Sequence, residues 1–268
     1  MTSNSDVTLS ASLLVGSEAV RARVASEIQS TLNFASRDDR EKMALICRFL
    51  ADQGHTMSLL GQITVRNDDG TYFTNNLMTG FAEVQRSNVL RVDDSLNVIE
   101  GDGMANPATR FHMWIYARRP EIRCIIHTHA PHASALAMTA TPLQVAHMDM
   151  MMFYDDCALL PQWPGVPVAN EEGRIISEAL QDKHSILLAN HGLLTVGENL
   201  DHAAYLAANL EYAARLQLLT GLTGRPIQPV APELAREARR MATLPRIMTA
   251  NVEHWLRLTE RRYPEALQ

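Results

Sequence analysis

The fold of this chain can be worked out from one segment, which reads Ile122-Arg-Cys-Ile-Ile-His-Thr-His-Ala-Pro-His132. Its first half is typical of a β-strand, because isoleucine occupies three of the first five positions. In a strand, alternate side chains leave the same face, so His127 and His129 are expected to direct two imidazole rings to one point. Pro131 suits the first turn of a helix. A strand that ends in paired histidines just before a helix is a favourable place for a metal ion.

A third histidine, His191, follows a second apolar strand candidate at residues 185–189. It lies 62 residues after His129, and both stretches end where open α/β sheets bind ligands. Three neutral imidazoles leave open positions on a divalent ion, as a catalytic rather than a structural metal requires. The expected ion is zinc, manganese or iron. An H-x-H pair alone is weak evidence, since two histidines at a strand end can also bind only backbone and water.

The composition is that of a globular protein. The 268 residues suffice for one α/β domain with arms or for two small domains. No apolar run approaches the ~18 residues that span a bilayer, and the polar start of the chain lacks the features of a signal peptide. A net charge of −6 without a basic run argues against nucleic acid as a partner. The three cysteines form no C-x-x-C pair, which fits a reducing, cytoplasmic location.

Lysine is scarce in this chain, which limits the chemistry available to it. The two lysines, Lys42 and Lys183, both lie in polar stretches. A Schiff-base enzyme needs a desolvated lysine, so imine chemistry is not expected.

Periodicity predicts strands interleaved with amphipathic helices. Strands are expected at residues 61–66, 72–73, 89–92, 98–99, 122–126, 185–189 and 193–196, and helices at 38–53, 174–180, 200–219 and around 111–115. The pattern Ser36-x-x-Asp39 is expected to begin the first helix. Several connections are hairpin-short, so the expected fold class is α/β with a mixed, largely antiparallel sheet.

We divide the chain into an N-terminal arm (residues 1–35), a main domain (36–222) and a C-terminal helical arm (223–268). The N-terminal arm is expected to hold one short helix. The C-terminal arm is expected to form one or two charged helices that pack on a neighbouring subunit.

The remaining histidines have simpler expected roles. Four of them are expected to be solvated, because they lie at predicted helix ends or on polar faces: His55, His184, His202 and His254. His112 lies in an amphipathic helix and is expected to pack or to form a hydrogen bond rather than to bind metal.

Four segments together resemble the class II aldolase/adducin superfamily. They are Arg119-Pro-Glu-Ile122 leading to His127-Thr-His-Ala130, the strand Ser185–Gly197 with its Asn190-His-Gly192 signature, the helix segment Leu210-Glu-Tyr-Ala-Ala214, and the strand Gly61-Gln-Ile-Thr-Val-Arg66. The similarity extends over roughly residues 38–220. It implies a three-layer α/β/α domain around a mixed sheet, commonly assembled as a tetramer with sites at subunit interfaces.

The resemblance also implies roles for individual residues. His127, His129 and His191 match the three metal-binding histidines of the family. Substrate contacts are expected from Gln62, which replaces the asparagine of the early strand motif, from Thr74 at the start of the next loop, and from Asn190 beside the third histidine.

Two departures from the family argue against a sugar-phosphate substrate. In its sugar-phosphate aldolases an acid/base glutamate lies four residues before the histidine of the Arg110-Phe-His112 motif, and that position is Ala108 here. The loop equivalent to their phosphate-binding loop reads Thr74-Asn-Asn-Leu-Met-Thr-Gly80 and lacks its pattern. A non-phosphorylated substrate is therefore expected.

The expected chemistry is metal-dependent cleavage of a C–C bond. A divalent ion can hold two oxygens of a 2-oxo or hydroxy carboxylate and stabilise the enolate formed when the bond breaks. Decarboxylation needs only a proton donor to finish, and the candidate donors are His147 and Tyr154. The methionines at 148 and 150–152 would suit an aromatic or otherwise apolar substrate, but such a run is equally typical of core or interface packing.

Three functions remain open. The first is a metal-dependent lyase, either a decarboxylase or an aldolase, acting on a small non-phosphorylated carboxylate. The second is a non-haem iron oxygenase that cleaves an aromatic 2-oxo acid, because some superfamily members in aminocoumarin biosynthesis look like such enzymes. The third is a non-catalytic interaction module like the adducin head domain, although the complete set of three histidines argues against it.

Overall fold

The computed structural model describes residues 18–32, 34–166 and 170–268. Within these ranges eight strands form one sheet, in the order β4-β3-β2-β1-β5-β8-β7-β6. The strands are β1 (Gln62–Arg66), β2 (Tyr72–Thr74), β3 (Leu90–Val92), β4 (Val98–Glu100), β5 (Cys124–Thr128), β6 (Cys157–Leu160), β7 (Ser185–Leu188) and β8 (Gly192–Gly197). All neighbours pair antiparallel except β6 and β7, which are parallel. The predicted mixed, largely antiparallel sheet is confirmed.

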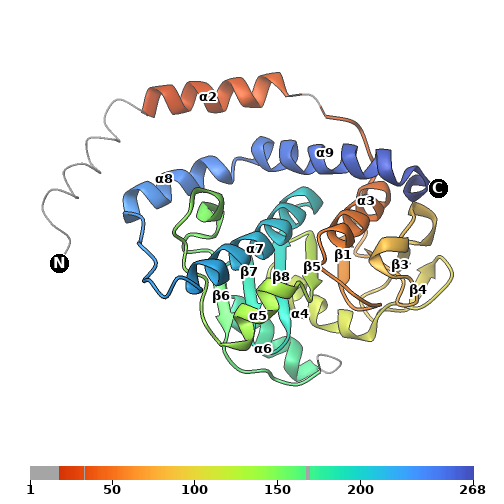
Figure 1. Cartoon of the computed structure of the whole chain (residues 1–268). Helices are drawn as coiled ribbons and strands as arrows, with labels where there is room; N and C mark the ends of the chain where they lie inside the picture. Colours follow the sequence, from red (N-terminus) through yellow and green to blue (C-terminus); the bar gives the residue numbers. More distant parts are fainter. Residues whose placement is uncertain (1–17, 33, 167–169) are drawn as a thin grey trace, which may run out of the picture.

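Helices cover both faces of this sheet (Figure 1). The helices are α2 (Glu18–Thr31), α3 (Asp39–Asp52), α4 (Arg110–Arg118), α5 (Pro131–Met138), α6 (Asn170–Leu180), α7 (Leu200–Gly221), α8 (Pro232–Ala242) and α9 (Pro245–Arg262). One apolar cluster packs α3, α5, α7 and α9 against the sheet, and a second packs α4 and α6. Alternation along β5 supplies both clusters, with Ile126 in the first and Ile125 in the second. This is the predicted three-layer arrangement.

The N-cap of the first helix of the main domain lies two residues later than its sequence pattern suggested. Asp38, rather than Ser36, is the N-cap of α3, and its side chain accepts a hydrogen bond from the backbone N–H of Glu41. The side chain of Glu41 accepts one from the N–H of Asp38 in return. Because both donors would otherwise be unpaired at the helix end, this reciprocal pair fixes where α3 starts.

The C-terminal helices lie against their own chain. In Figure 1, α8 and α9 run along the top of the sheet domain, with α2 beyond them. Met248, Val252 and Leu256 of α9 are buried in the same apolar cluster as α3 and α7. α9 therefore completes the core of its own chain, and packing of residues 223–268 on a neighbouring subunit stays a prediction. In the described part of the chain, no helix has the length and apolarity that crossing a membrane requires.

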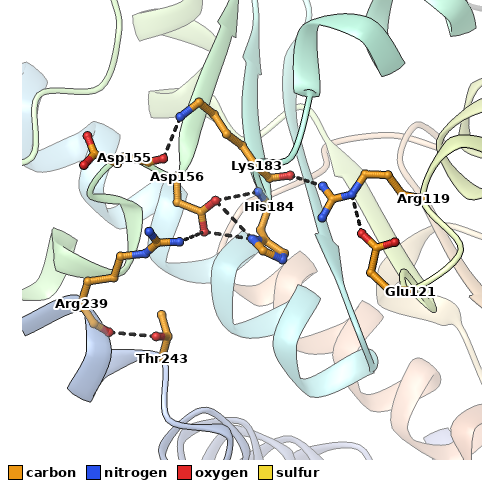
Figure 2. Close-up of polar contacts among 8 residues, drawn as sticks. All are labelled: Arg119, Glu121, Asp155, Asp156, Lys183, His184, Arg239 and Thr243. Atoms are coloured by element: carbon orange, nitrogen blue, oxygen red, sulfur yellow. Dashed lines mark hydrogen bonds and ion pairs between the residues drawn. The ribbon is translucent and has the colours of Figure 1, made fainter. Parts of the chain in front are cut away.

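A polar cluster fixes α8 to the edge of the sheet (Figure 2). The carboxylate of Asp156, just before β6, lies 2.9 Å from the guanidinium of Arg239 in α8. It also accepts hydrogen bonds from the backbone N–H and the ring Nδ1 of His184, which precedes β7. The buried carboxylate of Asp156 therefore links the segments before β6 and β7 to helix α8.

Candidate metal centre

The end of β5 delivers two of the three candidate ligands. His127 pairs with Gln62 of β1 on one side and with Leu194 of β8 on the other, so the central position of the strand fixes its backbone. Its ring is buried and packs edge-on against Phe111 of α4, with the ring centroids 5.3 Å apart. His129 follows two residues later, and its ring centroid lies 5.0 Å from that of His127. The predicted same-face placement of the two rings is what the structure has.

The turn between β7 and β8 delivers the third ligand, His191. Asn190 adopts a φ of +56°, a conformation that asparagine tolerates better than most residues. There is no room for a side chain at Gly192, because a Cβ there would lie 2.4 Å from the carbonyl oxygen of Thr128. The Asn-His-Gly motif therefore lets β8 pass close to the end of β5 and places His191 beside the other two histidines.

The three rings form a compact group. One potential ligand atom from each lies within 4.8 Å of the other two, and the His127 and His129 Nε2 atoms are 3.2 Å apart. Nδ1 of His127 is 2.8 Å from the carbonyl oxygen of Leu193, which can only accept. Nδ1 therefore carries the proton, and Nε2 presents a lone pair to the group. Tetrahedral zinc with Zn–N bonds of ~2.0–2.1 Å separates its nitrogens by about 3.3 Å, so this spacing fits a shared ion.

The three imidazoles are held in the neutral form that binds metal. Burial lowers the pKa of His127 well below its usual value, and its two neighbours add to the effect. Burial likewise lowers the pKa of His129, and that of His191 to about 4 with a contribution from His129. The group is therefore ready to coordinate a cation without first losing protons.

The carboxylate of Glu211 on α7 binds the start of the helix that follows the first two histidines. Glu211 accepts hydrogen bonds from the backbone N–H groups of His132 (3.0 Å) and Ala133 (2.8 Å) and from Nδ1 of His132 (2.6 Å). These groups lie in the first turn of α5, whose N-cap residue has no capping side chain. Glu211 therefore anchors the helix that begins directly after His129.

The histidines open into a cavity of about 460 Å³. Of the residues expected to contact substrate, Gln62 and Asn190 line it, and Thr74 does not. Ala108 lines it as well, in the turn before α4. Sequence reasoning missed five further lining residues: Leu60, Asn106, Pro107, Trp163 and Val166. Apart from Asn106 these are apolar, so the histidines face a largely apolar chamber.

The two candidate proton donors lie elsewhere in the chain. His147 lines a separate cavity beside the end of α7, and its side chain is more than half exposed. Neither His147 nor Tyr154 lines the histidine cavity. Met150, Met151 and Met152, which lie between these two residues in the sequence, are buried and do not line the histidine cavity either. The apolar wall of the site is instead built from the residues around Ala108 and Trp163.

Two expectations for the other histidines have opposite outcomes. His112 is fully buried, and its Nδ1 lies 2.8 Å from the hydroxyl of Thr64, as expected for a hydrogen-bonding residue. His55, expected to be solvated, is also fully buried, with its Nδ1 2.9 Å from the hydroxyl of Thr128. The expectation for His55 was wrong because a residue in a loop after a helix can still face a strand that the local sequence does not reveal.

This chain is similar to known proteins in sequence and to solved structures in fold. Decarboxylase NovR from Streptomyces niveus is 34% identical over 182 residues, which cover 66% of this chain and 67% of NovR. A protein named 4-hydroxy-3-prenylphenylpyruvate oxygenase/4-hydroxy-3-prenylbenzoate synthase, from Streptomyces roseochromogenus subsp. oscitans, is 34% identical over the same length. That alignment covers 66% of this chain and 65% of the relative, just under two thirds of its length.

A solved structure extends the likeness to the whole domain. L-fuculose 1-phosphate aldolase from Glaciozyma antarctica PI12 matches with a TM-score of 0.79 and 25% identity, covering 91% of this chain and 99% of that one. The profile of the family described as Class II Aldolase and Adducin N-terminal domain matches residues 41–218. That range contains the sheet, the three histidines and Glu211, and this chain belongs to the class II aldolase/adducin family.

Proposed function

We propose that this chain is a metal-dependent lyase. In this proposal it cleaves a C–C bond, by decarboxylation or retro-aldol cleavage, in a small non-phosphorylated carboxylate that carries an apolar or aromatic group. The single observation that carries the proposal is a cavity lined by three converging histidines and by mostly apolar side chains besides them. His127, His129 and His191 would hold one divalent ion, which when bound would act as a Lewis acid on the carboxylate and its neighbouring oxygen.

The cavity favours chemistry that starts without a base. Its described lining residues include no carboxylate, lysine or tyrosine, and Ala108 stands where the resemblance places an acid/base glutamate. Loss of CO₂ requires no proton to be removed first, whereas many other C–C cleavages do. The proton that completes the reaction would come from water or from a neighbouring subunit. His147 and Tyr154 stay candidates only in the second case, within the tetramer that we also propose.

The cavity beside the three histidines offers a substrate both a polar group and apolar surface. The Oε1 atom of Gln62 is buried without a hydrogen-bond partner among the described residues, and it is available to orient a polar group of the substrate. Three apolar residues that line the cavity are about half exposed: Leu60 (49%), Trp163 (51%) and Val166 (58%). Covering such side chains with an apolar or aromatic substituent would remove them from water.

A second candidate is an iron-dependent oxygenase acting on an aryl 2-oxo acid. The observation in its favour is the name of one relative, which joins an oxygenase with a benzoate synthase. The same three histidines would hold iron, and the open positions would accept dioxygen. The two candidates differ in whether oxygen is consumed, not in which residues form the site.

Turnover of two aromatic acids with and without oxygen separates the candidates. A lyase releases CO₂ from 2-oxo-3-phenylsuccinate, leaving the enolate of phenylpyruvate, at the same rate under strict anaerobiosis, whereas an oxygenase consumes one O₂ per turnover of phenylpyruvate and stops without it. Oxaloacetate and a ketose 1-phosphate serve as substrates that lack the aromatic group or add a phosphate. Absence of turnover in air and under nitrogen, with metal bound, would favour the adducin-like interaction module over both enzymes.

A further inference from the structure

A second cavity of about 480 Å³ lies beside α4, and it shares no lining residue with the cavity of the candidate metal centre. Its polar groups come from several elements: Arg66 ends β1, Tyr72 begins β2, Asp94 lies in the loop after β3, Arg110 begins α4 and Asn170 begins α6. Neither the reaction proposed above nor the three histidines account for this concentration of charged and aromatic residues.

The two arginines of this cavity have no carboxylate partner among the described residues. The guanidinium of Arg66 reaches the backbone carbonyls of Tyr116 and Pro120, and that of Arg110 reaches the carbonyl of Asp94 at 3.5 Å. By contrast, Arg91, Arg119 and Arg123 nearby each contact an aspartate or glutamate. Two guanidinium groups that lack a carboxylate partner in one cavity indicate a site for an anion.

The charge of the lining limits which anion suits the site. Arg66 and Arg110 contribute two positive charges, and Asp94 contributes one negative charge. The balance of one positive charge matches a carboxylate better than a phosphate group, which carries nearly two negative charges at neutral pH. Burial and the charge of Asp94 raise the pKa of Tyr72, although Arg66 opposes them, so its hydroxyl stays protonated and can donate to an anion.

Three of the lining residues are aromatic: Tyr72, Trp114 and Tyr116. Tyr72 and Tyr116 lie with their ring centroids 5.1 Å apart, and the guanidinium of Arg66 lies 5.3 Å from the centroid of Tyr116. Trp114 is held in place by a hydrogen bond of 3.4 Å from its indole N–H to Asn170. Such faces favour stacking with a flat ring. We propose that this cavity binds an aromatic monocarboxylate, with the carboxylate between Arg66 and Arg110 and the ring against Trp114.

Calorimetric titration of the full chain with benzoate tests this proposal. Saturable binding is expected in the wild type, weakened about tenfold in Arg110→Gln, because one charged hydrogen-bonding partner is removed. Arg118→Gln is the matched control, since Arg118 is an exposed arginine on the same helix outside the cavity. Cyclohexanecarboxylate and inorganic phosphate are expected to bind more weakly than benzoate.

A variant of the metal centre distinguishes the two cavities. Benzoate is expected to bind His129→Ala as well as it binds the wild type. Absence of saturation below about 10 mM would overturn the proposal, as would equal weakening in Arg110→Gln and Arg118→Gln. So would loss of binding in His129→Ala alone, which would place the ligand in the metal cavity.

A crystal soaked in 4-bromobenzoate gives a readout that does not depend on how the variants fold. The anomalous signal of bromine is expected beside Trp114. Bromine found only beside His129 and His191 would contradict the assignment of this cavity.

Discussion

The Nε2 atoms of His127 and His129 lie 3.2 Å apart, on alternate residues at the end of one strand. The proton on His127 is fixed at Nδ1 by the carbonyl of Leu193, so its facing Nε2 carries a lone pair. At this distance His129 protonated at Nε2 can donate a hydrogen bond to His127, or the two nitrogens can share a cation. The lowered pKa of both rings keeps them neutral, which is the form that binds a metal ion.

Gly192→Ala should damage both stability and the metal centre. A methyl group there meets the carbonyl oxygen of Thr128 at 2.4 Å and the ring of His129 at 3.1 Å. Thermal or urea unfolding is expected to show a loss of about 1 to 3 kcal/mol, as for an overpacked core position. Gly221→Ala is the control, because a Cβ at Gly221 meets nothing within 4 Å. Two variants of equal stability would show that the backbone does not need to approach so closely at the Asn-His-Gly turn.

Glu211→Ala should loosen the helix that follows His129. It removes three hydrogen bonds to the first turn of α5, and the expected loss in free energy of unfolding is about 2 to 3 kcal/mol. Glu211→Gln keeps one acceptor oxygen and should lose less. The measurement is urea unfolding of both variants, and hydrogen exchange at Ala133 would show the loosening directly. Wild-type stability in Glu211→Ala would mean that the carboxylate does not support α5.

Trp163→Ala should alter which substrates the enzyme prefers. Because Trp163 lines the cavity with three histidines, its loss removes an aromatic contact from an apolar substituent. We expect KM for 2-oxo-3-phenylsuccinate to rise about tenfold with little change in kcat, and KM for oxaloacetate to stay unchanged. Trp163→Phe keeps a flat ring and should behave much like the wild type. An equal rise in KM for both substrates would argue for a general structural effect instead.

Acid should destabilise the edge of the sheet where α8 is attached. Burial lowers the pKa of His202 to about 4, and the neighbouring His184, 5.0 Å away between ring centroids, adds to the shift against the opposing charge of Asp156. The unfolded chain takes up this proton near pH 6.5, so the free energy of unfolding falls as pH falls from about 6.5 to 4, by up to about 3 kcal/mol.

Asp156 extends the same trend to lower pH. Burial would raise the pKa of its carboxyl, but hydrogen bonds and charge from His184 and the charge of Arg239 outweigh this effect and lower it (Figure 2). The contribution of Asp156 to stability is present above its unfolded pKa and is lost as pH falls through the lower folded value.

The contribution of His202 can be measured by urea unfolding between pH 7 and 4. The free energy of unfolding should fall less over this range in His202→Gln than in the wild type. Identical pH profiles for the two proteins would contradict this assignment.

Local patterns in the sequence predicted much of the fold and the grouping of the three histidines in the candidate metal centre. Alternation along residues 122–129 was sufficient to place His127 and His129 on one face, and the break after residue 189 placed His191 at a strand end. These features depend on backbone geometry over a few residues, so the sequence displays them directly. The resemblance to the class II aldolase/adducin superfamily implied the three-layer arrangement of helices around the sheet.

Other features depend on contacts between distant segments, which local patterns do not display. The short strand β6 pairs with β7 and carries no alternation of its own, so it was not predicted. Trp163 stands in a loop rich in proline and glycine, where only the tertiary fold brings it to the histidines. The methionines near His147 were ambiguous between core and binding wall. The structure buries Met150, Met151 and Met152 away from the site and leaves Met148 exposed.

Metal content of the purified chain, measured by mass spectrometry of the elements in the wild type and in His129→Ala, tests the central claim most directly. The account predicts one divalent ion per wild-type chain and almost none in His129→Ala, with the circular dichroism of the variant unchanged because the ligands end strands rather than fill the core. Equal metal in a folded His129→Ala variant, or none in a wild type supplied with zinc, manganese and iron, would contradict it.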